Sequence, residues 1–154
     1  MLTAESGPPI FSSSHSDDLA LIGLGPVERF AVDIERVRRI DDFAAVAARF
    51  FTPHELAAIG DPGDAHALDR FYRCWVLKEA FVKALGEGLS HPLDSFSVDI
   101  TTDPPRLVST ATGDPSDWRF GLIQPRPGWI AAIACAAGSL GPIDLRSWSF
   151  DTLP

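Results

Sequence analysis

Two segments of the chain carry acidic side chains whose types and spacing are suited to chemistry. In "RFAVDIE", residues 29–35, a strand-like alternation puts Asp33 and Glu35 on the same face, roughly 7 Å apart. Like charges this close are unfavourable unless water or a cation neutralises them. An all-oxygen set without histidine or cysteine suits Mg²⁺ rather than zinc. The pattern therefore predicts either a metal site or a solvated carboxylate pair on an exposed strand edge.

The second segment, "FYRCWVLKEAFVKALGEGL" at residues 71–89, has the periodicity of a helix. The helix is expected to run from about residue 65 to residue 85, where the following glycines end it. Lys78 falls inside its apolar stripe, which is formed by Phe71, Cys74, Leu77, Phe81 and Leu85. A lysine there either packs its stem and extends its ammonium to water, or it has a function.

Glu79 and Lys83 lie one helical turn apart on a face beside that stripe. Taken alone, they predict a surface ion pair, worth only about 0.3–0.5 kcal/mol. If the helix instead packs on the strand at 29–35, Glu79 becomes a third oxygen ligand beside Asp33 and Glu35. Such a site would suit Mg²⁺ that keeps several waters and a substrate phosphate.

The helices and strands that must position these groups are predicted from their apolar runs and from the capping and turn residues at their ends. The apolar run "LALIGLG" at 19–25 predicts a buried strand before the strand at 29–35. Residues 41–51 predict a helix, and "TPHELAAIG" predicts a short one with Thr52 as N-cap and Glu55 at the third position. Four later runs predict an antiparallel meander, at 94–100, 105–110, 117–123 and 128–137.

This order of elements predicts an α+β fold in which a three-helix layer packs on an antiparallel sheet. The length of 154 residues suits one domain spanning 1–154. Its core is expected at 8–137 and a weakly patterned tail at 138–154, where Trp148 and Phe150 are expected to dock.

Charge and composition exclude several classes of function. The net charge of −8 disfavours nucleic acid as a partner, because a phosphate backbone demands a basic surface. No apolar run is long enough to span a bilayer and no secretory signal is evident, so we expect no membrane association and a cytoplasmic location. Both cysteines, Cys74 and Cys135, sit in apolar stretches, which predicts buried thiols. Several arginines are close in sequence and suit either a solvated surface or an acidic partner or phosphates: Arg29, Arg36, Arg38, Arg39 and Arg49.

Three motifs together resemble the 4′-phosphopantetheinyl transferases, and the surfactin-type branch in particular. "VDIE" at 32–35 is similar to the first metal motif of that family, and "WVLKEAFVK" at 75–83 to its W-x-x-K-E-A-x-x-K signature. "SHS" at 14–16 resembles its upstream phosphate-binding element. The flanking segments "RFFTPHE" and "PLDSFSV" are similar as well, so that the likeness runs from about residue 7 to residue 137.

The resemblance implies an activity. It is the transfer of the phosphopantetheine arm of coenzyme A to a serine of an acyl or peptidyl carrier protein, with release of 3′,5′-ADP. Such a reaction loads negative charge onto a pyrophosphate, which Mg²⁺ and cationic side chains stabilise.

The resemblance also assigns roles to individual residues. Asp33, Glu35 and Glu79 would hold Mg²⁺, while Lys83 would lie against the coenzyme A phosphates with Lys78 helping to orient them. Ser14 and His15 would contact the 3′-phosphate. Glu55 or Glu79 would accept the proton of the attacking serine. Independently of the resemblance, Glu55 also fits a structural role as the capping partner of Thr52.

Surfactin-type members have two similar halves, and this chain corresponds to the second half together with "SHS". The resemblance therefore implies one of two alternatives: the sequence is a truncated form, or another copy or a partner chain completes the cleft, as in the trimers of the holo-acyl-carrier-protein synthase branch. Two departures are noted: Ala31 replaces a glycine, and "FSSSHS" replaces F-N-x-S-H-S. The alternatives are an inactive module that binds coenzyme A or a carrier protein, and a different enzyme on the same scaffold.

Overall fold

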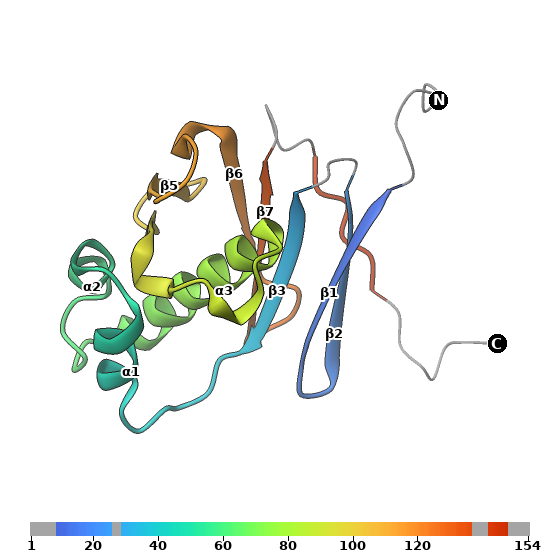
Figure 1. The fold of residues 1–154 in the computed structure, drawn as a ribbon. Helices are drawn as coiled ribbons and strands as arrows, with labels where there is room; N and C mark the ends of the chain where they lie inside the picture. The colour runs from blue at the N-terminus through green and yellow to red at the C-terminus, as the bar shows by residue number, and fades with distance from the viewer. Residues whose placement is uncertain (1–8, 26–28, 137–141, 148–154) are drawn as a thin grey trace.

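A computed structural model describes residues 9–25, 29–136 and 142–147 (Figure 1). Its helices are α1 (Phe43–Phe50), α2 (Pro53–Ile59) and α3 (Ala67–Leu85). Its strands are β1 (Ile10–Ser16), β2 (Leu19–Gly25), β3 (Phe30–Arg36), β4 (Ser97–Asp99), β5 (Arg106–Ser109), β6 (Trp118–Ile123) and β7 (Trp129–Ala136). Short 3-10 turns lie at Gly88–Ser90, Leu93–Ser95 and Pro115–Asp117. The predicted α+β architecture with a helical layer on an antiparallel sheet is confirmed.

The centre of the fold is a three-stranded antiparallel sheet in the order β3-β7-β6. Helix α3 lies on one side of β3, and the β1–β2 hairpin lies on the other (Figure 1). Strand β7 is buried along nearly its whole length because both of its faces are covered. Its many alanines leave room for α3 to pack closely on the sheet.

Alternation along β3 divides its side chains between these two layers. Ala31 belongs to the core beneath α3, whereas Ile34 packs with Trp129 and Ala131 under the hairpin. Asp33 and Glu35 share the face of Ala31 and therefore point toward α3. The predicted placement of Asp33 and Glu35 on one face of the strand is confirmed.

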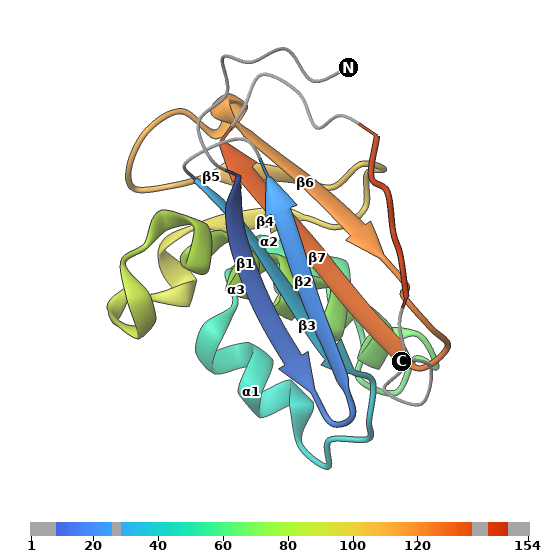
Figure 2. The ribbon, with the colours of Figure 1, turned by 90° about the vertical axis from the view of Figure 1, so that its right-hand side faces the viewer.

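The hairpin β1–β2 runs alongside β3, as Figure 2 shows. Its inner face packs through Leu19 and Leu21, and Gly23 approaches β3 so closely that an added Cβ would meet Val32 Cγ1 at 2.6 Å. Its outer face exposes Phe11, Ile22 and Leu24, which are 72%, 68% and 70% accessible. The prediction of a buried strand at 19–25 is therefore wrong for every second residue.

The late strands do not form one meander. β4 pairs with β5 in a separate two-stranded sheet, while β6 pairs with β7 in the central sheet. Strand β1 was not expected. Its sequence is rich in serine and poor in the apolar residues that are typical of most strands. Both cysteines are buried and free, as predicted.

Two expectations from the sequence concern membranes and the tail. Over the part of the chain described, no helix combines the length and apolarity needed to cross a membrane. Residues 142–147 form neither helix nor strand. Trp148 and Phe150, which were expected to dock, lie outside the described residues.

Candidate active site

Asp33 is the most buried of the three predicted metal-binding carboxylates, with only 4% of its surface accessible. Its Oδ1 accepts hydrogen bonds from Lys83 Nζ at 2.6 Å and from Ser14 Oγ at 2.9 Å. Its Oδ2 is buried without any hydrogen-bond partner. Burial raises the pKa of Asp33, and the nearby Lys83 ammonium opposes that shift. The alternative of a fully solvated strand edge is therefore wrong for Asp33.

Glu35 and Glu79 stand on the two elements that meet at this point, β3 and α3. The Oε2 of Glu35 accepts a hydrogen bond from Ser16 Oγ at 3.2 Å. Burial and then the Asp33 charge raise the pKa of Glu35. Burial also raises the pKa of Glu79, and the charges of Asp33 and Glu35 add to this shift while Lys83 opposes it. The three carboxylates therefore share one electrostatic environment.

Lys83 joins α3 to β3 and β1. Its Nζ donates to Asp33 Oδ1, to Ser14 Oγ at 3.2 Å and, more weakly, to the Val32 carbonyl at 3.5 Å. The sequence alone suggested a surface pair with Glu79, but the packing of α3 on β3 gives the lysine a partner on the strand instead. The Lys83 side chain keeps 36% of its surface accessible. It can therefore contact a ligand from solvent while it stays bound to Asp33.

The donor set fits a hard cation, although it is not assembled as a cage. Over the described ranges 9–25, 29–136 and 142–147, no three acidic, histidine or cysteine side chains lie close enough together to hold an ion. The buried and unpartnered Asp33 Oδ2 is nevertheless an oxygen that a cation would satisfy. Charge supports the same assignment. Burial is the main cause of the raised pKa values of Glu35 and Glu79, and repulsion between the carboxylates adds to it; a divalent cation would offset that repulsion.

Lys78 and Glu55 lie elsewhere, in the interior between α2, α3 and β4. Both side chains are fully buried and form an ion pair at 2.6 Å. Lys78 also donates to the Phe96 carbonyl at 2.8 Å, and its ammonium lies over the Phe96 ring. Neither expectation for Lys78 is correct, because the ammonium reaches neither water nor a surface where a phosphate could bind.

Both carboxylate oxygens of Glu55 are hydrogen-bonded within the chain, and the side chain is fully buried, so a substrate does not reach them. Its Oε1 accepts from Lys78 and from the Val98 amide at 2.9 Å, and its Oε2 accepts from the Thr52 amide at 2.8 Å. The last bond is half of a complete capping box at the start of α2. Of its two predicted roles, the structure supports the structural one and contradicts that of a catalytic base.

The two residues expected at the 3′-phosphate lie on opposite faces of β1. Ser14 points inward, where its hydroxyl bonds Asp33 and Lys83 and accepts from the Ile34 amide at 3.3 Å. His15 lies on the outer, exposed face of the hairpin, as the two-residue period of a strand requires. Within this chain they do not converge on one position.

Residues that were not singled out also contribute to the site. Ser16 bonds Glu35, and both Ser12 and Ser16 bond the backbone of β3. Their signal in the sequence is the placing of serines at every second position of "FSSSHS", which assigns them to one face of a strand.

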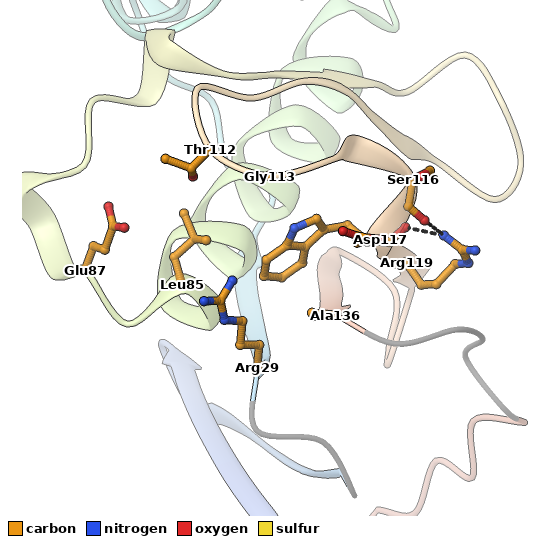
Figure 3. A pocket seen from close by; sticks show the side chains of 10 residues that line it. Arg29, Leu85, Glu87, Thr112, Gly113, Ser116, Asp117, Arg119 and Ala136 are labelled. Atoms are coloured by element: carbon orange, nitrogen blue, oxygen red, sulfur yellow. Dashed lines mark hydrogen bonds between the residues drawn. The ribbon is translucent and has the colours of Figure 1, made fainter.

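A separate open pocket of about 930 Å³ lies where α3 ends (Figure 3). Its wall includes Arg29, Glu87, Trp118 and Arg119, and none of the predicted site residues lines it. Arg119 donates to the carbonyl oxygens of Ser116 and Trp118, so much of its hydrogen-bonding capacity is used locally. The carboxylates and Lys83 therefore define the candidate active site better than this hollow does.

The fold and this site define an α+β domain with a carboxylate–lysine centre between a strand and its covering helix. A family model described as the 4′-phosphopantetheinyl transferase superfamily matches residues 29–134. The chain belongs to the 4′-phosphopantetheinyl transferase superfamily.

Individual relatives agree with this membership. The chain is 32% identical over 133 residues to the 4′-phosphopantetheinyl transferase HetI of a Nostoc species, covering 86% of this chain and 54% of that protein. It is 33% identical over 143 residues to the 4′-phosphopantetheinyl transferase Sfp of Bacillus subtilis, covering 93% of this chain and 62% of that protein. The chain thus spans little more than half the length of these relatives.

Among solved structures, the fold is similar to a holo-(acyl-carrier-protein) synthase from Bacillus anthracis, crystallised in complex with CoA (3′,5′-ADP). The two share a TM-score of 0.55 and 18% sequence identity, over 70% of this chain and 93% of that one. At this level of identity the likeness supports the fold.

Proposed function

We propose that this chain transfers 4′-phosphopantetheine from coenzyme A to a serine of an acyl or peptidyl carrier protein. The serine oxygen forms a bond to the β-phosphorus as the bond from that phosphorus to the bridging oxygen breaks. The products are the phosphopantetheinylated carrier and 3′,5′-ADP, and the serine proton is released. The observation that carries the proposal is the Asp33–Lys83 contact, because it joins the two family motifs at one partly exposed centre.

The residues at this centre have different proposed roles: phosphate binding, metal binding and proton acceptance. Lys83, whose side chain is partly exposed, binds the phosphates of coenzyme A. Asp33, Glu35 and Glu79 hold Mg²⁺, which when bound neutralises charge developing on the pyrophosphate. Glu79 is half-buried on the helix beside them, whereas Glu55 is sealed in the core, so Glu79 is the better candidate to accept the serine proton.

The decisive experiment follows the mass of a carrier protein. With coenzyme A, Mg²⁺ and this chain all present, an apo carrier should gain the mass of one phosphopantetheine unit. Omission of any one component, or addition of excess EDTA, should abolish the gain. A panel of apo acyl and peptidyl carriers that stays unmodified under all conditions would refute the proposal.

We also propose that a second copy of this chain, or a companion half, covers the outer face of the β1–β2 hairpin. That face exposes Phe11 opposite Leu24, with Ile22 beside them. Adjacent exposed apolar side chains of this size mark interaction surfaces. His15 lies on the same face, so its phosphate-binding role would be fulfilled at the interface.

The hairpin face gives a prediction about assembly. In light scattering, the wild-type protein should be an oligomer and the double variant Phe11→Ser/Leu24→Ser a monomer, because the variant removes apolar area from the interface. Its transfer activity should fall with the loss of assembly. Val108→Ser, which alters an exposed apolar residue on β5, is the control and should leave the mass unchanged. A wild-type protein that is monomeric with full activity would contradict this prediction.

A module that binds coenzyme A or a carrier without transferring the arm is the second candidate. It is favoured by one observation: within the described residues, no three acidic, histidine or cysteine side chains lie close enough together to hold an ion. Calorimetry separates the two functions. Carrier binding that persists without turnover and is insensitive to Glu79→Gln would identify the module.

A further inference from the structure

Alternate serines of β1 attach this strand to the edge of β3 through their side chains. The hydroxyl oxygens of Ser12, Ser14 and Ser16 accept hydrogen bonds from the amides of Val32, Ile34 and Arg36, at 3.1, 3.3 and 2.9 Å. These amides point away from β7 and would otherwise be open donors at the sheet edge. We call the three residues the serine ladder.

Two members of the serine ladder also orient a carboxylate. A hydroxyl carries one proton, and accepting an amide leaves that proton free to be donated. Ser14 donates it to Asp33 and Ser16 donates it to Glu35, in each case to the residue just before the amide that it holds. Ser12 accepts from the Val32 amide, and the residue just before Val32 is Ala31, so Ser12 has no carboxylate to orient.

Ser14 and Ser16 differ in how many of their hydrogen-bonding positions are already used within the chain. Ser14 accepts from both the Ile34 amide and Lys83 Nζ, so its one donor and both acceptor positions are used within the chain. Ser16 accepts from the Arg36 amide and donates to Glu35 alone. It is almost buried, at 9% accessible, which keeps water from competing for the Glu35 oxygen.

We propose that Ser16 is a positioning residue for the metal site: it holds the Glu35 carboxylate in the direction needed to bind a divalent cation. The inference rests on the proposed function, since it concerns the same Mg²⁺. The β3 amide fixes the orientation of the hydroxyl, and the hydroxyl fixes the carboxylate. Partners of this kind orient metal ligands at many protein sites, and their loss weakens metal affinity about 10–100-fold.

The test compares Ser16→Ala with Ser12→Ala, because both variants remove one rung of the serine ladder and only the former frees a carboxylate. Mg²⁺ affinity is measured by calorimetry on the folded protein with no other ligand, and the thermal midpoint is measured in parallel. We expect Ser16→Ala to weaken Mg²⁺ binding about 10-fold. Ser12→Ala should lower the midpoint by a similar amount and leave Mg²⁺ affinity unchanged. Ser16→Thr, which restores a hydroxyl, should recover most of the affinity.

Equal Mg²⁺ affinities for Ser16→Ala and the wild type would overturn the inference, as would equal losses in Ser16→Ala and Ser12→Ala. A wild-type protein that binds no Mg²⁺ would overturn it too, because there would be no metal ligand to position. Failure of the proposed function is distinguishable, since it is a wild-type protein that binds Mg²⁺ and modifies no carrier. In that case the affinities of the three variants still decide the inference.

Discussion

Replacing Glu79 by glutamine is expected to lower carrier modification at least about 100-fold while the fold becomes no less stable. The loss of activity follows because the amide has no charge with which to bind Mg²⁺ and accepts no proton; changes even to the partners of metal ligands cost about 10–100-fold. Initial rates at saturating coenzyme A and Mg²⁺, followed by carrier mass, measure the effect. Fluorescence-monitored melting of the same samples measures the stability.

Electrostatics gives the sign of the stability change. Burial and the charges of Asp33 and Glu35 raise the pKa of Glu79 above its ordinary value of 4.5. A carboxyl group with a raised pKa binds its proton more tightly in the folded chain, so stability falls as the pH rises through the interval between the ordinary and the raised pKa. Above that interval the cost is fully present. The neutral amide removes it, so the melting temperature without Mg²⁺ should stay the same or rise.

Asp69→Asn is the matched control for Glu79→Gln. Asp69 lies in the first turn of the same helix, where its carboxylate pairs with Arg73 at 2.8 Å on the exposed side. The substitution makes the same chemical change away from the site, and activity should stay within about twofold of the wild type. Full activity of Glu79→Gln, or an equal loss in both variants, would contradict the assignment of Glu79.

Replacing Lys78 by methionine is expected to destabilise the protein by about 3–5 kcal/mol, because it leaves the Glu55 carboxylate buried without its cation. Urea unfolding followed by circular dichroism gives the free energy of unfolding. Lys78 donates to the Phe96 carbonyl, and Glu55 accepts hydrogen bonds from two backbone amides. These contacts join α2, α3 and β4 at one buried point, so the effect should extend over the whole helical layer.

Double-mutant analysis separates this ion pair from simple loss of packing. Lys78→Met/Glu55→Gln should lose less than the sum of the single variants, with a coupling of about 1–3 kcal/mol, because no unpaired charge remains. Arg73→Met is the control, since it removes a solvent-accessible pair on the same helix and should cost no more than about 1 kcal/mol. Additive losses would show that Lys78 and Glu55 do not stabilise one another.

Local signals in the sequence were sufficient for β3, α2 and α3. The capping box of Thr52 and Glu55, the alternation around Asp33 and the glycine after Leu85 each act within a few residues, so the pattern fixes them. Convergence of α3 on β3 was predicted from the carboxylates and confirmed by the Lys83–Asp33 bond.

The sequence could not reveal contacts made between distant segments. Lys78 looks exceptional on its helix because its partner, Glu55, is 23 residues away on another element. The strand β1 is held by bonds from its serines to β3 some 20 residues later, which leave no apolar pattern behind.

Helix α3 carries its two notable lysines in opposite directions. Lys78 points to the interior between α2 and β4, whereas Lys83 points to β3 and to solvent. The helix therefore places a buried ion pair that stabilises the fold and the lysine proposed to bind phosphate on separate sides. Substitutions at Lys83 therefore leave the buried Lys78–Glu55 pair intact, whereas substitutions at Lys78 consume the stability margin of the whole domain.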